Sequence, residues 1–192
     1  NWFSVDVGST GVTADMGAAI CAGGASRVSA GLGIELCGSI LLSNNGAIQF
    51  INNVAEQGSG GAIGLSYGSD LNVNDNHSVL FDSNTASMGR GGAIVAYNSG
   101  VYFRRNNAIT FTNNRSDSWE GGAIYIGGST YSETTPMVFD ANKSIEFSSN
   151  YARSGGALRI GSNSSETHVF QNNIGDASSS DTVDILFKLN ES

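Results

Sequence analysis

The side chains that most often carry out catalysis are scarce in this chain. Its two histidines, His77 and His168, belong to no His/Cys cluster that could bind a transition metal. The run Asp70–Asn74 resembles the start of a calcium-binding EF-hand loop. However, Asp75 replaces the glycine that such a loop needs, and Phe81 stands where its bidentate glutamate belongs. The sequence therefore predicts neither a metal site nor a cofactor.

A repeated tetrapeptide shows how the chain is organised. Gly-Gly-Ala followed by Ile or Leu begins at Gly60, Gly91, Gly121 and Gly155, at intervals of roughly 30–34 residues, and Gly17–Ile20 is a degenerate copy. Self-similarity at this period is typical of solenoids, in which each repeat stacks on its neighbours.

A second motif, Phe-x-x-Asn, alternates with the first, and an aliphatic residue lies two positions before each Phe. Its copies are Phe50–Asn53, Phe81–Asn84, Phe111–Asn114, Phe147–Asn150 and Phe187–Asn190. Another asparagine precedes four of these Phe by five residues: Asn45, Asn76, Asn106 and Asn142. Phe170 and Asn173 take that place in the last unit, and Phe3–Asp6 resembles the tail of a preceding unit.

Each unit contains three short stretches in which apolar residues alternate with polar ones, and no long amphipathic segment separates them. In the third full unit these stretches are Ala93–Ala96, Val101–Phe103 and Ile109–Thr112. We therefore predict an all-β fold, a right-handed parallel β-helix of about five rungs with three short strands each. It forms one domain over residues 1–192: residues 1–16 end a preceding rung, and the rungs span about 17–59, 60–90, 91–120, 121–154 and 155–192.

Stacking explains the motif residues. Identical rungs about 4.8 Å apart place Phe on Phe and Asn on Asn. Asn amides at a bend can then hydrogen bond to the Asn above and below as a ladder. The paired glycines allow positive φ and a close approach of two backbones where the chain enters the first strand.

Composition argues against two function classes. The net charge of −8 and the lack of clustered Lys and Arg exclude a phosphate-binding face, so no nucleic-acid partner is expected. Glycoside hydrolysis needs two carboxylates about 5–10 Å apart. The outward positions of the first strand form no acidic row: Cys21, Gly64, Val95, Tyr125 and Arg159. We expect no enzyme, and a carbohydrate-active β-helix enzyme is the least favoured alternative.

The interleaved Gly-Gly-Ala-[Ile/Leu] and Phe-x-x-Asn copies resemble the polymorphic outer-membrane protein (Pmp) family of chlamydiae, over the chain from Phe3 to Asn190. The resemblance implies a fragment of an autotransporter passenger. Such a passenger is held in the membrane only through a C-terminal barrel that this chain lacks, and it lies on the bacterial surface or is secreted after processing. The family's passengers are implicated in adhesion, which implies a host cell-surface protein or glycan as receptor, and self-association as a further option.

The resemblance also implies a role in adhesion for the repeated motifs. The residues concerned are Gly60, Gly61, Ala62, Ile63, Phe81, Asn84, Gly91, Gly92, Ala93, Ile94, Phe111, Asn114, Gly121, Gly122, Ala123, Ile124, Phe147 and Asn150. Because the motif Phe and Asn should be buried, we expect the contacts themselves to come from exposed loops. Candidates are Arg115 and Trp119 in the connection Arg115–Glu120, and Tyr131 in Gly127–Pro136. The alternative for Trp119 is packing over the neighbouring turn. A spacer or immune decoy without its own receptor is the rival function.

The two cysteines, Cys21 and Cys37, flank the long connection Ala22–Leu36. A disulfide here would close a loop of about 17 residues and stabilise the fold by roughly 3 kcal/mol in the chain-entropy model. It would indicate an oxidising compartment. The alternative is two unrelated buried thiols.

We predict that Cys21 and Cys37 are bridged in protein made under oxidising conditions. Mass spectrometry of unreduced peptides should recover the two cysteine-containing peptides as one linked species. Recovery of two free thiols would contradict the bridge.

Overall fold

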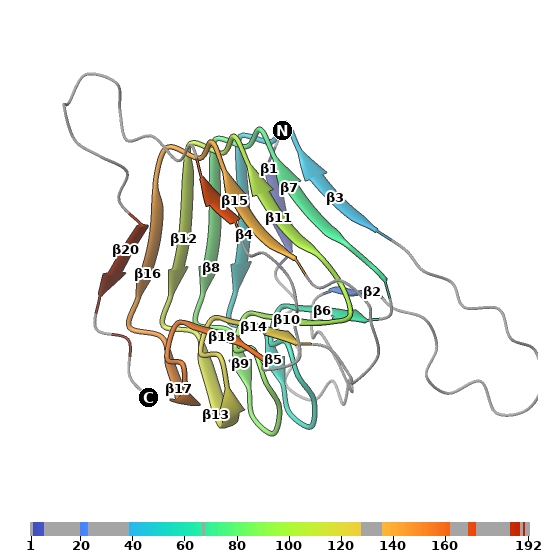
Figure 1. Ribbon diagram of the computed structural model, residues 1–192, viewed down its shortest axis with the longest axis vertical. Coiled ribbons are helices and arrows are strands. Elements are labelled where there is room, and N and C mark those ends of the chain that lie inside the picture. Colours follow the sequence, from blue (N-terminus) through green and yellow to red (C-terminus); the bar gives the residue numbers. More distant parts are fainter. Residues whose placement is uncertain are drawn as a thin grey trace, which may run out of the picture.

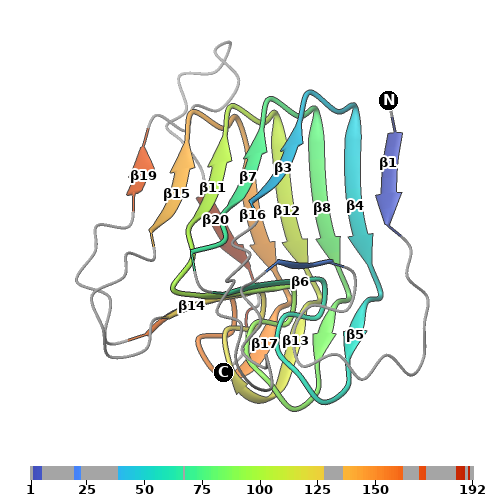
Figure 2. The same cartoon turned by 90° about the vertical axis from the view of Figure 1, so that its right-hand side faces the viewer.

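The protein is a parallel β-solenoid (Figure 1). The computed structural model describes residues 2–5, 20–22, 39–66, 68–127, 136–161, 169–171, 185–188 and 190, and these form strands but no helix. Equivalent strands of successive coils lie side by side in both views (Figures 1 and 2). Four parallel sheets therefore run along the stack, and they confirm the expected fold class.

The sheets are numbered here in the order in which a coil passes through them. The first sheet contains β2 (Ile20–Ala22), β6 (Ile63–Ser66), β10 (Ile94–Tyr97), β14 (Ile124–Gly127) and β18 (Leu158–Ile160). The second contains β3 (Ile40–Ser43), β7 (Leu71–Asn74), β11 (Val101–Arg104), β15 (Met137–Asp140) and β19 (Val169–Gln171). The third contains β1 (Trp2–Val5), β4 (Ala47–Ile51), β8 (Ser78–Asp82), β12 (Ala108–Thr112), β16 (Ile145–Ser148) and β20 (Ile185–Lys188). The fourth contains β5 (Val54–Ala55), β9 (Thr85–Ala86), β13 (Arg115–Glu120) and β17 (Tyr151–Ser154).

The fourth sheet corrects the prediction of three strands per rung. After the Phe-x-x-Asn copies that begin at Phe81, Phe111 and Phe147, the backbone continues to hydrogen bond to the preceding coil. Thr85 N donates to Asn53 O, and Arg115 N donates to Asn84 O, both at 2.8 Å. The number of rungs also differs slightly from the expected five. Four complete turns, β2–β5, β6–β9, β10–β13 and β14–β17, are followed by β18–β20 without a fourth strand among the described residues.

The register between coils follows the repeats. Phe111 pairs with Phe81 on one side and Phe147 on the other, which is the stacking that the motif predicts. At the N-terminal end the predicted alignment of Phe3 with the motif Phe was wrong by two residues. Phe3 pairs with Ile48 and takes the aliphatic position of the motif, while Val5 pairs with Phe50. Asp6 lies outside the described residues.

Two stacks of phenylalanine fill the core. The rings of Phe81 and Phe111 are nearly parallel, with centroids 4.7 Å apart, and the stack continues to Phe147. Phe103 and Phe139, from the second sheet, form a parallel stack that meets the first edge to face, at 83° between Phe103 and Phe111. All five side chains have no exposed surface. Aromatic pairs prefer these offset and edge-to-face geometries, so the stacks add to the energy of burial.

Asparagine ladders hold the two corners that flank the third sheet. Nδ2 of Asn84 donates to Oδ1 of Asn114, and Nδ2 of Asn114 donates to Oδ1 of Asn150, both at 2.9 Å. Each amide also reaches the backbone: Asn114 Nδ2 donates to Phe81 O, and Asn114 Oδ1 accepts from Asn84 N. The hydrogen-bonding groups of a fully buried corner are therefore satisfied by the neighbouring coils, as the ladder prediction requires.

Each of these corners is formed by one residue in the left-handed conformation followed by the ladder asparagine. The left-handed residues have φ between 52° and 58°. At the corner between the second and third sheets they are Asn44, Asp75, Arg105 and Ala141, and at the corner between the third and fourth sheets they are Asn52, Ser83, Asn113 and Ser149. This single conformation turns the chain, and the following Asn side chain is buried at seven of the eight positions and half-buried at Asn45.

We expect Asn114→Ala to lower the free energy of unfolding by about 1–3 kcal/mol, because the amide of Asn84 and the carbonyl of Phe81 lose their buried partner. Phe111→Ala should cost about 3–5 kcal/mol through the cavity left in the stack. Denaturant melts measure both. Thr112→Ala, on the outer face of β12, is the control and should stay within about 0.5 kcal/mol of the parent chain. A neutral Asn114→Ala would contradict the ladder's role.

Candidate functional site

The repeated motifs are not accessible at the surface. The motif Phe, Asn, Ala and Ile side chains have no exposed surface in any copy from Ala62 to Asn150. In the copy that begins at Gly155, Ala157 is buried, and Gly155 and Leu158 are half-buried. The paired glycines of the copies that begin at Gly60, Gly91 and Gly121 are buried as well. These residues build the stack, and a partner cannot contact them without unfolding it.

The two motif glycines have different roles. The first has positive φ in each described copy, 72° at Gly121, which favours a residue without Cβ. The second allows the coils to approach closely. A Cβ on Gly122 would lie 1.8 Å from the carbonyl oxygen of Gly156, and one on Gly92 would lie 2.1 Å from that of Gly122. Both predicted roles are confirmed.

The outward side of the first sheet is covered. Val95 and Tyr125 have outward parity, yet their exposed fractions are 0% and 8%. Tyr125 lies on β14. It is covered by Arg90, from the turn that precedes β10, and by Tyr97 of β10. The Arg90 guanidinium carbon lies 4.9 Å from the centroid of the Tyr125 ring, and the Tyr97 ring is tilted against Tyr125 at 5.7 Å. Burial raises the pKa of the Tyr125 hydroxyl.

Arg90 is the centre of this arrangement. Its guanidinium also lies 4.9 Å from the Trp119 ring, its Nε donates to Glu120 Oε2 at 3.2 Å, and an Nη donates to the Tyr97 hydroxyl at 3.5 Å. Desolvation by burial opposes the charge on Arg90, but the contacts with Tyr97 and Glu120 outweigh it and raise its pKa. Cation–π contacts to two rings and an ion pair thus hold Arg90 in one geometry.

The segment Arg115–Glu120, expected as a loop, is strand β13. It pairs with β9 and β17, and its Ser116 is buried with Oγ donating to the Gly89 carbonyl at 2.8 Å. The reason is that both neighbouring coils offer backbone partners along this edge. Trp119 is nevertheless 51% exposed, and its ring also packs against Arg90 of the neighbouring turn, as the alternative for this residue expects. Tyr131 lies outside the described residues, as does Cys37, so the disulfide stays a prediction.

Five side chains on and beside β13 are at least partly exposed, and we call them together the β13 surface: Met88, Arg90, Arg115, Trp119 and Tyr151. Met88 is 63% exposed. Arg115 is ion-paired with Asp117, which raises its pKa, and its guanidinium lies 4.7 Å from the Tyr151 ring. Trp, Tyr and Arg are the residue types that dominate binding energy at protein interfaces.

The described residues contain neither a metal-binding cluster nor a helix that could span a membrane. No group of three or more His, Cys, Asp or Glu side chains is placed to hold a metal ion there. Within the same ranges, no helix is long and apolar enough to cross a membrane.

We expect Gly122→Ala to destabilise the fold by about 3 kcal/mol or more, because backbone of the next coil must move to admit the methyl group. Gly161→Ala is the matched control. Its added Cβ would lie 3.1 Å from the Tyr125 hydroxyl and 3.3 and 3.4 Å from backbone atoms of Gly127 and Ile126, so it meets no backbone atom as closely as the Cβ on Gly122 does. Thermal melts of both variants measure the difference, and equal melting temperatures would contradict the close-approach role.

Comparison with known proteins supports the family resemblance for one repeat unit. Comparison with curated proteins and with solved structures found no match. Residues 108–127 match the Chlamydia polymorphic membrane protein repeat, and this stretch contains β12, β13 and β14 with one copy of each motif. This part of the chain is therefore similar to the repeat of the chlamydial polymorphic membrane proteins.

Proposed function

We propose that this chain belongs to an autotransporter passenger on the bacterial surface and that it binds host cells through the β13 surface. The observation that carries the proposal is the half-exposed Trp119 ring held over Arg90. The repeat match over residues 108–127, which includes Trp119, supports a surface-associated passenger.

The β13 surface is suited to a protein receptor because its large side chains are already ordered. Arg90 is fixed between two rings and Glu120, and Arg115 is fixed by Asp117 and Tyr151. Side chains that are rigid before binding lose little conformational entropy when they bind, so more of their contact energy appears as affinity. The exposed Met88 adds an adaptable apolar contact.

In this proposal the Gly-Gly-Ala and Phe-x-x-Asn motifs act indirectly. They fix the register of the coils, and the register brings Arg90 of one coil under Trp119 of the next. Changing a motif residue should therefore reduce adhesion only as far as it disturbs the stack. This separates the proposal from one in which the motifs themselves contact the receptor.

A spacer or immune decoy is the second candidate function. The continuous buried core and the two asparagine ladders would make the chain a stiff rod, and a spacer needs this stiffness but no receptor. The exposed tryptophan favours the adhesin, because about half of its surface stays open to solvent beside Arg90 and Trp is among the residue types that dominate binding energy at interfaces. A carbohydrate-active enzyme is the least favoured, because the outward positions of the first sheet carry no row of carboxylates.

We expect Trp119→Ala to weaken binding of the purified chain to host cells about tenfold, the loss typical of one hot-spot residue, and the addition of Arg115→Ala to weaken it further. Single outward substitutions are preferable to replacement of the whole segment, because Ser116 and Glu120 hold the coils together. Cell binding is measured by flow cytometry, with the fold checked by circular dichroism.

The control is Glu56→Ala. Glu56 is exposed and lies just after β5. The pairings of Val54 with Thr85 and of Thr85 with Arg115 make it equivalent to Asp117, which lies within β13 two coils later. Undiminished binding of the double variant would contradict a role for the β13 surface. A parent chain that binds no host cell would favour the spacer or decoy.

A further inference from the structure

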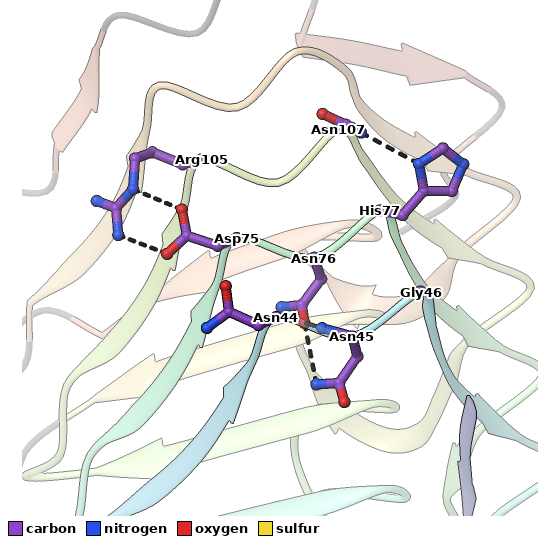
Figure 3. Close-up of a pocket in the computed structure, with 8 residues that line it drawn as sticks. All are labelled: Asn44, Asn45, Gly46, Asp75, Asn76, His77, Arg105 and Asn107. Carbon is purple, nitrogen blue, oxygen red and sulfur yellow. Dashed lines mark hydrogen bonds and ion pairs between the residues drawn. The ribbon is translucent and has the colours of Figure 1, made fainter. Parts of the chain in front are cut away.

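A shallow hollow of about 460 Å³ opens at the corner between the second and third sheets (Figure 3). Three consecutive coils line it, and it lies outside the β13 surface. No aliphatic side chain and no Phe, Tyr or Trp is among the described residues that line it. Its polar groups recur at the spacing of the coils, about 4.8 Å.

One side of the hollow carries an ion pair between two coils. Arg105 donates from Nε to Asp75 Oδ1 and from an Nη to Oδ2, both at 2.7 Å. The hydrogen bond and the charge of Arg105 lower the pKa of Asp75, and Asp75 raises that of Arg105. A guanidinium has five N–H donors and this bidentate contact uses two, so the pair still presents donors and carboxylate lone pairs to a ligand while its charges cancel.

The other side carries a pair of side chains from the second and third of these coils. Asn107 Nδ2 lies 3.1 Å from His77 Nδ1. With this amide as donor, the neutral imidazole carries its proton on Nε2 and can donate it outward. Figure 3 shows the Asp75–Arg105 and His77–Asn107 pairs on opposite sides, with corner asparagines between them.

The space itself exists because one coil has glycine where the next two have large polar side chains. His77 N donates to Asn45 O and Asn107 N donates to Asn76 O, so Gly46, His77 and Asn107 follow equivalent ladder residues. Gly46 is exposed, and it is not among the described residues with positive φ. Glycine is therefore not required there by the backbone, and its effect is to leave the hollow open.

We propose that this hollow is a binding site for a neutral, hydroxyl-rich carbohydrate of one or two sugar units. Sugar hydroxyls both donate and accept hydrogen bonds, and the hollow presents both kinds of group on fixed side chains. The volume lies within the range of about 300–1,000 Å³ found for small-ligand sites. The lack of apolar lining disfavours an apolar ligand, and the cancelled charges disfavour a strongly ionic one.

The test uses a panel of four neutral disaccharides: lactose, maltose, mannobiose and N,N′-diacetylchitobiose. A heparin disaccharide is included as the charged comparison. Each is titrated into the isotope-labelled 192-residue chain, and the His77 ring and Arg105 Nε–H signals are followed by NMR. We expect at least one neutral disaccharide to shift both sets of signals in a saturable manner.

Two variants locate the binding. Gly46→His places in the hollow the side chain that the next coil has at the equivalent position, and it should raise the Kd about tenfold or more. Arg105→Gln together with Asp75→Asn removes the ion pair, keeps Asn at a left-handed position that it tolerates, and should raise the Kd similarly. Glu56→Ala should leave it unchanged. The second variant decides the matter if the first fails to fold.

Three results would overturn the proposal: no neutral disaccharide binds, only the heparin disaccharide binds, or the Kd is unaffected by the variants that fold. Because the titration uses no cells and does not involve Trp119, its outcome is separate from that of the adhesion experiment.

Discussion

The side-chain amide of the corner asparagine is the interaction on which this structure depends. In Asn114 one amide group bonds to the asparagines of the coils before and after it and to the backbone of the preceding coil. A shift of one residue in register would leave all of these buried groups without partners and would turn the adjacent Phe111 out of its stack. The ladder therefore fixes the register of the third sheet, and the other sheets follow because they belong to the same coils.

The same corners decide where chemistry can be placed. The residue before each ladder asparagine must adopt a left-handed conformation, which costs about 1–2 kcal/mol for a residue such as Arg105 or Ala141. Backbone hydrogen bonds between coils hold it there, as from Arg105 N to Asp140 O at 3.0 Å. Because the backbone is held in this way, the outward side chain can vary. Asn44, Asp75 and Arg105 thus occupy one conformation in three successive coils and give the hollow its mixture of acceptors and donors.

The parts of the fold that repeat could be predicted from the sequence. A Phe recurring with an aliphatic residue two positions before it defines one inward face, and the pairing of Phe187 with Phe147 shows that the pattern holds across the long connection before β20. The Phe170 alignment with Phe139 and the Ile20 alignment with Ile63 are confirmed for the same reason. Burial of the motif Asn also followed from the physics of the corner, without knowledge of its neighbours.

The sequence could not predict the short strands, or the contacts between side chains that differ from coil to coil. A two-residue strand such as β5 is too short to show an alternating pattern. Only one short segment represents the rung of β1, so its sequence also fitted a register two residues from the observed one. The cover over Tyr125 needs Arg90 and Tyr97 from the preceding coil, and Glu120 joins Arg90 to Arg159 of the following one. None of these pairs forms part of a motif.

The contacts that stabilise the fold and the surfaces proposed for binding therefore lie at two different kinds of position. Equivalent residues that stay the same from coil to coil pack against one another or hydrogen bond to one another inside the molecule, as in the Phe111 stack and the Asn114 ladder. Equivalent residues that differ, as Gly46 and His77 do, leave surfaces that the stack does not fill. A solenoid built in this way can change the second kind of position with little effect on its fold, because the core and the ladders do not depend on the side chains found there.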